Sequence, residues 1–159
     1  MNKRPKTVVI IAIEISCVML LLAHVGTVCC LYDSLPERIS AHYNFKGLPD
    51  GYGEKSSIFG LPAISFAIYL VMTFLYRKPE ICNYPVPVTD ENRTQLYNYT
   101  RLLIRYLKLI FTIVFFYITV CTLYGQPLGL FFSSVIMLAI FGPAIYVIIK
   151  MWSLKTPAK

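Results

Sequence analysis

Charged residues are scarce in this chain, and acidic residues are the scarcer kind. Asp, Glu, Lys and Arg make up 14% of the 159 residues, and only eight residues are Asp or Glu. Hydrophobic residues reach 57%, and the mean hydropathy is +0.61. A soluble domain of this length carries far more charge on its surface, so the composition excludes that class and is typical of a multi-pass membrane protein.

The sequence also lacks the short motifs that mark common cofactor, nucleotide and metal sites. It has no P-loop, no dinucleotide-binding glycine pattern, no CxxC or HExxH spacing and no internal repeat. Its five cysteines include the adjacent pair Cys29 and Cys30, which can bridge each other only with strain, so no disulfide framework is expected. We therefore expect no cofactor, no bound metal and no catalytic residues, and the absence of motifs favours a binding role over an enzymatic one.

Four apolar runs are long enough to cross a membrane as helices, since a span takes roughly 20 residues. They cover residues 7–31, 58–76, 107–124 and 127–149. The first run is about 25 residues long, which exceeds the apolar core of a cleaved signal peptide, so we expect an uncleaved span. The predicted fold class is an all-α membrane protein with four transmembrane helices in a single domain, 1–159.

The basic residues sort by side of the membrane. Twelve of the 15 Lys and Arg residues precede the first span, follow the fourth, or lie between the second and third. Lys108 is counted in this last group. The other three lie in the loop at 32–57. The positive-inside rule then places both termini in the cytoplasm and this loop outside. The net charge of +7 reflects that bias, so the expected partner is the lipid bilayer and not nucleic acid.

The longest polar stretch, residues 35–56, combines strand and turn patterns. Its first half alternates between an apolar face and a polar face. The apolar face has Ile39, Ala41, Tyr43 and Phe45, and the polar face has Ser40, His42, Asn44 and Lys46. Period-2 alternation predicts an extended segment, and a tight turn is predicted at residues 48–51, where Pro, Asp and Gly follow one another. We expect an ordered loop outside the membrane, made of a short extended segment and a turn.

The residues of this loop that either bind a ligand or structure the loop's own turns are His42, Asn44, Asp50, Gly51, Tyr52 and Lys55. Both roles stay open, because Asx side chains beside glycines usually hold turns. In an extended strand His42 lies on the side open to a ligand. A metal-dependent enzyme at the outer leaflet, the alternative, would draw on Asp33, Glu37, His42, Asp50 and Glu54.

Two ionisable residues, Glu14 and His24, lie inside the first span. Such residues are costly in lipid and usually face a partner or a cavity. They are ten positions apart, about 80° from alignment on a helix, so both can border one bundle-facing side. Either Glu14 pairs near the cytoplasmic end while a neutral His24 bonds a neighbouring span, or the two form a proton or ion path, which would suit an accessory subunit of a transporter.

Residues 77–106 form the predicted cytoplasmic segment between the second and third spans. Prolines mark a linker, and apolar positions spaced by three and four then predict an amphipathic helix with a basic face. We expect residues 90–106 to be helical, to lie in the inner headgroup layer, and to be continuous or nearly so with the third span.

One set of residues resembles the pattern of a bacterial membrane family, the domain of unknown function 1648. The matching residues are LPERI at 35–39, HYN at 42–44, Gly47, PDGYG at 49–53 and Lys55. Ser40, Tyr43 and Glu54 depart from that pattern, in which Pro, Phe and Ser are usual. Residues 83–86 and 89–92 resemble the cytoplasmic segment of the family's short members.

The LPERI portion is also distantly similar to the N-terminal part of Sdp-type immunity proteins, which protect producer cells from a peptide toxin. The resemblance implies a place in the bacterial cytoplasmic membrane and a non-enzymatic role in sensing, immunity or ligand recognition through the outer loop. The expected partner is a peptide or a membrane-surface ligand, or another membrane protein if the chain is an accessory subunit.

Overall fold

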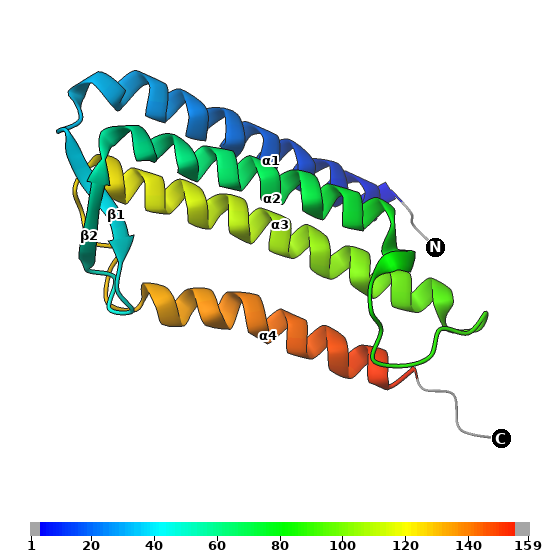
Figure 1. Ribbon diagram of the computed structural model, residues 1–159. Coiled ribbons are helices and arrows are strands. Elements are labelled where there is room, and N and C mark those ends of the chain that lie inside the picture. The colour runs from blue at the N-terminus through cyan, green and yellow to red at the C-terminus, as the bar shows by residue number, and fades with distance from the viewer. Residues whose placement is uncertain (1–3, 155–159) are drawn as a thin grey trace.

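Four long helices dominate the computed structural model, which describes residues 4–154 (Figure 1). They are α1 (Arg4–Leu31), α2 (Gly60–Arg77), α3 (Arg93–Leu123) and α4 (Phe132–Trp152). Each is long and apolar enough to cross a membrane, so the expected mostly helical membrane architecture is confirmed. Lys3, Lys155 and Lys159, which contribute to the charge bias, lie outside the described residues.

The loop between α1 and α2 is a strand pair flanked by short 3-10 helices. Strands β1 (Arg38–Tyr43) and β2 (Pro49–Glu54) pair antiparallel. The 3-10 helices η1 (Tyr32–Ser34) and η2 (Lys55–Phe59) join them to α1 and α2. An ordered loop was expected here, but the predicted turn at residues 48–51 is wrong, because those residues enter β2.

The predicted amphipathic segment is helical and continuous with the third span, as expected, but its apolar side faces protein. Residues 93–106 continue into α3 without interruption, giving one helix of 31 residues, about 46 Å at 1.5 Å per residue. Leu96 and Ile104 on its first half are buried, and Leu96 packs in a cluster with Val86, Val147 and Met151. The apolar positions that suggested contact with lipid headgroups therefore face the protein, and the short helix η3 (Pro79–Ile81) begins the linker that covers them.

Helices α1, α2 and α3 pack side by side, while α4 packs mainly against α3 and stands apart from the others (Figure 1). Between Phe132 and Pro143 no residue of α4 is fully buried, and burial resumes at Val147 and Met151 near its end. The first half of α4 is therefore loosely packed, with consequences for the cavity described below.

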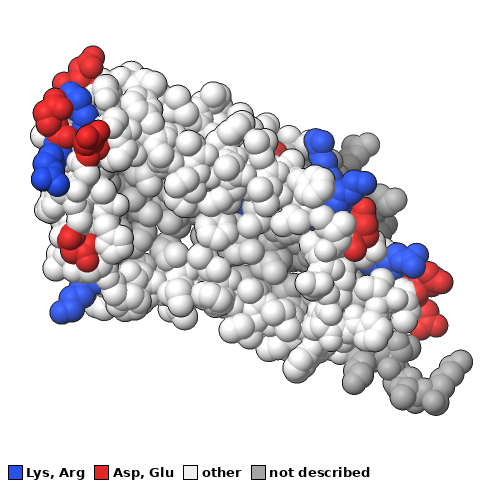
Figure 2. Space-filling model, viewed as in Figure 1, with Lys and Arg blue, Asp and Glu red and all other residues white. Residues whose placement is uncertain are grey.

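Charged side chains gather at the two ends of the molecule, with an almost uncharged band between them (Figure 2). We call the end with β1, β2 and the α3–α4 connection the hairpin end, and the end with η3 and the 79–92 segment the linker end. A small cluster of Val28, Leu35, Ile39 and Ile58 anchors the hairpin to α1 and η2. The band between the ends has the surface that a helical bundle presents to lipid.

Candidate functional site: a strand pair over a cavity

The strand pair is irregular at its centre, and the irregularity changes which side chains face the helices. Ser40 pairs with Tyr52 and His42 with Gly51, so Ala41 has no partner and forms a bulge. Ile39 is buried, whereas Ala41 and Phe45 are exposed, with Phe45 at 73%. A second irregularity follows, because Tyr43 pairs with Pro49 and leaves Asp50 of β2 without a partner. The expected apolar face is therefore interrupted at Ala41 and Phe45, whereas Ile39 and the half-buried Tyr43 keep the expected direction toward the helices.

The turn lies at residues 44–48 and is held by Asn44. Its side-chain oxygen accepts hydrogen bonds from the backbone N–H groups of Lys46 (2.9 Å) and Leu48 (3.1 Å). Gly47 has a φ of 73°, which favours glycine, and its N–H donates to the Asn44 carbonyl at 2.8 Å. Asn44 thus structures the turn, and both hydrogen bonds accepted by its side-chain oxygen come from the turn itself.

The turn docks directly on the connection between α3 and α4. The backbone N–H of Leu128 donates to the Gly47 carbonyl at 2.8 Å, and a Cβ on Gly47 would meet the backbone of Gly129. Nearby, the hydroxyls of Tyr43 and Thr122 are 3.0 Å apart. Because the strand pair follows α1 and precedes α2, these contacts join both halves of the bundle at the hairpin end.

His42 and Asp50 form the one pair among the predicted loop residues. His42 Nδ1 lies 2.6 Å from Asp50 Oδ1, so Nδ1 carries the proton that this carboxylate accepts. The His42 side chain is 72% exposed, and no described residue bonds its Nε2. Gly51 faces His42 across the strands; its φ is not positive, and a Cβ there would lie 3.0 Å from His42 Cβ.

Tyr52 and Lys55 point to other parts of the hairpin end. Tyr52 is 57% exposed, and its carbonyl accepts a hydrogen bond from Arg38 at 3.2 Å. Lys55 Nζ bonds Glu37 at 2.8 Å and lies 5.5 Å from the ring centre of Tyr32. The six predicted loop residues therefore do not converge on one point.

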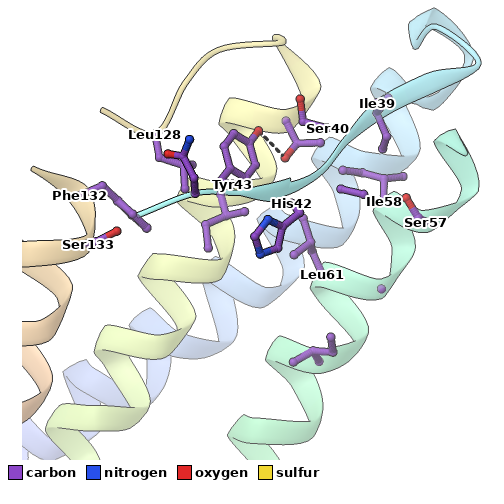
Figure 3. A pocket seen from close by; sticks show the side chains of 16 residues that line it. Ile39, Ser40, His42, Tyr43, Ser57, Ile58, Leu61, Leu128, Phe132 and Ser133 are labelled. Carbon is purple, nitrogen blue, oxygen red and sulfur yellow. Dashed lines mark hydrogen bonds between the residues drawn. The ribbon is translucent and has the colours of Figure 1, made fainter. Parts of the chain in front are cut away.

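A cavity of about 460 Å³ lies beneath the strand pair, between β1, α2, α3 and the start of α4 (Figure 3). The hairpin end contributes both polar residues, such as Ser40 and His42, and apolar ones, such as Ile39, while the helices contribute a mainly apolar lining. Leu61 of α2 lies on one side, Phe132 and Ser133 of α4 on the other, and His42 between them (Figure 3). No Lys, Arg, Asp or Glu lines this cavity.

Sequence reasoning missed the helical part of this lining. Ile64, Ile118, Phe132 and Ser133 come from three spans, and nothing in their order along the chain marks them as neighbours. The loop contributes Ser40, which the sequence placed on the polar face with His42. No hydrogen bond between the described residues joins the hydroxyl of Ser40 to His42.

Inside the band between the two ends, Glu14 of α1 forms an ion pair with Lys108 of α3. The Lys108 ammonium lies 2.6 and 2.7 Å from the two carboxylate oxygens and 3.3 Å from the Thr73 hydroxyl on α2. Lys108 is 1% exposed, so it lies inside the bundle and not in the cytoplasmic segment with which the charge count grouped it. The Tyr69 hydroxyl also donates to Glu14 at 3.4 Å, and three helices thus meet at this pair.

His24 faces the same interior as Glu14 but at a different level. It is fully buried, its Nε2 lies 2.6 Å from the Thr119 hydroxyl of α3, and Phe116 packs edge-on against its ring. His24 Nδ1 and the hydroxyl of Ser65 on α2 are buried without a protein partner in the described chain. A buried polar side of α3, made of Lys108, Thr112, Thr119 and Thr122, connects these groups.

The five acidic and histidine side chains proposed as metal ligands are not brought together. His42 pairs with Asp50, and Glu37 pairs with Lys55. Within residues 4–154 no three His, Cys, Asp or Glu side chains are arranged to hold a metal ion. A metal-dependent mechanism at the hairpin therefore has no donor set in this part of the chain.

These features define a multi-pass helical membrane protein whose ordered strand pair covers a cavity at one end of the bundle. Residues 18–66 match the family model described as a domain of unknown function (DUF1648). The match runs from the middle of α1 through the strand pair into α2, and it supports the resemblance seen in the loop residues. No curated protein matches the chain. No solved structure matches it either.

Proposed function

We propose that this chain is a non-enzymatic module of the bacterial cytoplasmic membrane that recognises a ligand at the outer face. The observation that carries the proposal is the cavity beneath the strand pair, which combines an apolar lining from three helices with His42 at its mouth. Cavities of this size and mixed lining are typical of binding sites, and the exposed Nε2 of His42 offers one oriented polar contact.

The charge bias supports an outward-facing hairpin end. Twelve basic residues lie on the side of the termini and three in the loop. Removing the buried Lys108 leaves eleven against three, so the bias survives the correction. Both termini are then cytoplasmic, and the cavity opens at the outer boundary of the membrane.

A binding role fits the His42–Asp50 pair better than catalysis does. An imidazole oriented by a carboxylate can act as a general base. Nucleophilic catalysis also requires a nucleophile that is hydrogen-bonded to the second imidazole nitrogen. Ser40 lines the cavity without a hydrogen bond to His42, and no acidic side chain lies in the lining. His42 with its partner is therefore suited to contact a ligand group and hold it in one orientation.

Within this proposal, recognition serves sensing or immunity. The similarity of the LPERI residues to Sdp-type immunity proteins motivates this role. The strand pair is bonded to the α3–α4 connection through Gly47 and Leu128, so an occupant of the cavity touches residues of both halves of the bundle. A ligand that binds one arrangement of the two halves better than another shifts the population between them.

A growth assay tests the proposal. The wild-type chain and two variants, Ser133→Trp and Ser134→Trp, are expressed in a bacterial host that is then exposed to a panel of membrane-active peptides. Ser133 lines the cavity, whereas its neighbour Ser134 is exposed and does not. We expect wild-type and Ser134→Trp cells to survive at least one peptide that kills cells with an empty vector or with Ser133→Trp. Equal survival of the two variants would contradict the role of the cavity.

The Glu14–Lys108 pair favours a second candidate, a small accessory subunit of a transporter. Ion pairs inside membrane helices often mark ion pathways or contacts with partner subunits. Glu14 is only partly buried, with its side chain 32% exposed, so one side of the pair is open toward a neighbour. Co-purification with a transporter that is lost in Glu14→Gln would support this candidate, and a homogeneous preparation of the chain alone would oppose it.

A further inference from the structure

We propose that the cavity beneath the strand pair takes a neutral membrane amphiphile, a molecule with one aliphatic chain and an uncharged head that bears hydroxyl or amide groups. The inference rests on the proposed function, since it names the class of ligand for the same site. Four observations carry it: the polarity of the lining, its lack of formal charge, its continuity with the lipid-facing surface, and its volume.

The lining mixes polar and apolar groups beside the strand pair and becomes apolar deeper between α2 and α3. Ser40, His42 and Ser57 come from the hairpin end, whereas Ile64 and Ile118 lie deeper along α2 and α3. Ile118 is more than a helical turn before the end of α3 at Leu123. A ligand with a polar head and a hydrocarbon tail matches this order when its head lies at the membrane boundary.

The polar groups available to a head are neutral hydrogen-bonding groups. The side-chain oxygen of Asn44 and the hydroxyl of Ser57 are occupied by the loop itself, the latter through a 2.7 Å bond to the Glu54 carbonyl. The hydroxyls of Ser40 and Ser133, the Nε2 of His42 and the side-chain N–H groups of Asn44 remain. Phosphate is bound preferentially by Arg or Lys, and neither lines this cavity. A second cavity at this end, which shares Ile39, Ser40 and Thr122 with the first, does include Arg38 and is the better place for a phosphate.

The cavity is continuous with the surface that faces lipid. Ile64 lines it and is nevertheless 50% exposed on α2. On the opposite side, α4 is attached at its start through Leu128 and Gly47 and near its end through Val147. The loosely packed stretch begins at Phe132 and Ser133, which line the cavity opposite Ile64. We therefore expect a chain to enter from the bilayer between α2 and α4 without passing through water.

The volume separates a small amphiphile from a peptide. About 460 Å³ lies within the range of roughly 300–1,000 Å³ found for small-molecule sites. A folded peptide would need a larger surface, and the exposed Phe45 and Tyr52 that could supply it are not part of the cavity lining. The cavity therefore fits the single chain of an amphiphile, whereas a peptide can place only one large side chain in it.

A photolabelling experiment with two matched probes tests the inference on the full chain in lipid nanodiscs. The first probe is a monoacylglycerol with a diazirine near the end of its chain, and the second is the lysophosphatidic acid with the same chain. Labelled residues are located by peptide mass spectrometry. We expect the neutral probe to label α2 around Ile64 and α3 around Ile118 at least five-fold more than the phosphate probe does.

The paired variants supply the control. Ser133→Trp, which fills the cavity, should reduce labelling by the neutral probe at least five-fold, and Ser134→Trp should leave it unchanged. Equal melting temperatures of the two variants exclude misfolding as the cause. Uniform labelling of all four helices, unchanged by Ser133→Trp, would overturn the site, and equal labelling by both probes would overturn the preference for a neutral head.

The photolabelling and growth experiments can fail independently, so failure of the lipid ligand can be told apart from failure of the proposed function. Absence of probe labelling together with Ser133-dependent survival in the peptide assay would overturn the lipid ligand and leave the recognition role intact. Specific labelling by the neutral probe without any peptide protection would support the lipid site and remove the immunity role.

Discussion

Replacing Lys108 by Met should strongly destabilise the bundle, because the change leaves the Glu14 carboxylate without its partner between helices. The Lys108 ammonium has three oxygen acceptors within 3.3 Å, two on Glu14 and one on Thr73, and the residue is 1% exposed. Met keeps the length and the apolar character of the Lys stem, so the substitution tests the charge and not the packing.

The magnitude follows from the burial of the two partners. Removing one member of a buried ion pair costs about 3–5 kcal/mol. Glu14 keeps one hydrogen bond, from the Tyr69 hydroxyl, so we expect the lower end of that range, about 3 kcal/mol. The matched control is Lys150→Met at an exposed position in the last turn of α4, where surface changes usually fall within about 0.5 kcal/mol.

The double variant Glu14→Gln with Lys108→Met gives the decisive comparison. With both charges removed, no uncompensated charge remains, so we expect it to recover about 2 kcal/mol of the loss. The free energy of unfolding is measured by SDS titration in mixed micelles and followed by circular dichroism. A Lys108→Met variant as stable as Lys150→Met, or a double variant that loses the sum of the single losses, would refute the reasoning.

Two further predictions concern the hairpin end. Gly47→Ala should lower the free energy of unfolding by more than Gly125→Ala does. Both glycines have positive φ, but only at Gly47 would the new Cβ meet the backbone of Gly129. Thermal melting that ranks the two variants equally would count against docking of the turn. His42→Ala should change the free energy of unfolding by less than about 0.5 kcal/mol, because the side chain is 72% exposed. The same variant should abolish peptide protection in the growth assay. Lost stability with retained protection would show that His42 only supports the structure of the loop.

The helical part of the fold could be predicted from the sequence because its signal is local. A span reveals itself by about 20 apolar residues in a row, whatever its neighbours are. The surroundings of the first half of α3 were harder to foresee than its helical state, because an amphipathic pattern does not say whether its apolar side meets lipid or protein. Here Leu96 meets Val147 and Met151 of α4, which lie some fifty residues further along the chain.

The strand pair shows where local patterns fail. Alternation from Ile39 onward predicted one strand with two clean faces, but pairing with β2 inserts a bulge at Ala41, and only the partner strand determines where a bulge falls. The Pro-Asp-Gly run favoured a turn at residues 48–51, yet Asn44 closes the turn earlier by bonding two backbone N–H groups.

The cavity and the ion pair were beyond sequence reasoning for a different reason. Lys108 lies near the predicted start of the third span, and residues near a span's end usually reach the headgroups. Its burial depends on Glu14 lying opposite, 94 positions away. Ser133 and Ile64 likewise acquire a role only once α2 and α4 are positioned around the strand pair.

The account requires above all that the hairpin end faces outward. Cysteine labelling with a membrane-impermeant maleimide in intact cells tests it, with Lys46→Cys as the outer marker and Glu91→Cys as the inner one, both at exposed positions. Native Cys29, Cys30 and Cys82 are replaced by Ala. Cys82 would serve poorly as an inner marker, because burial raises the pKa of its thiol and so lowers the reactive thiolate fraction.

We predict that position 46 is labelled in intact cells and that position 91 is labelled only after permeabilisation. Labelling of position 91 in intact cells, with position 46 protected until permeabilisation, would place the strand pair and its cavity in the cytoplasm and contradict recognition at the outer face.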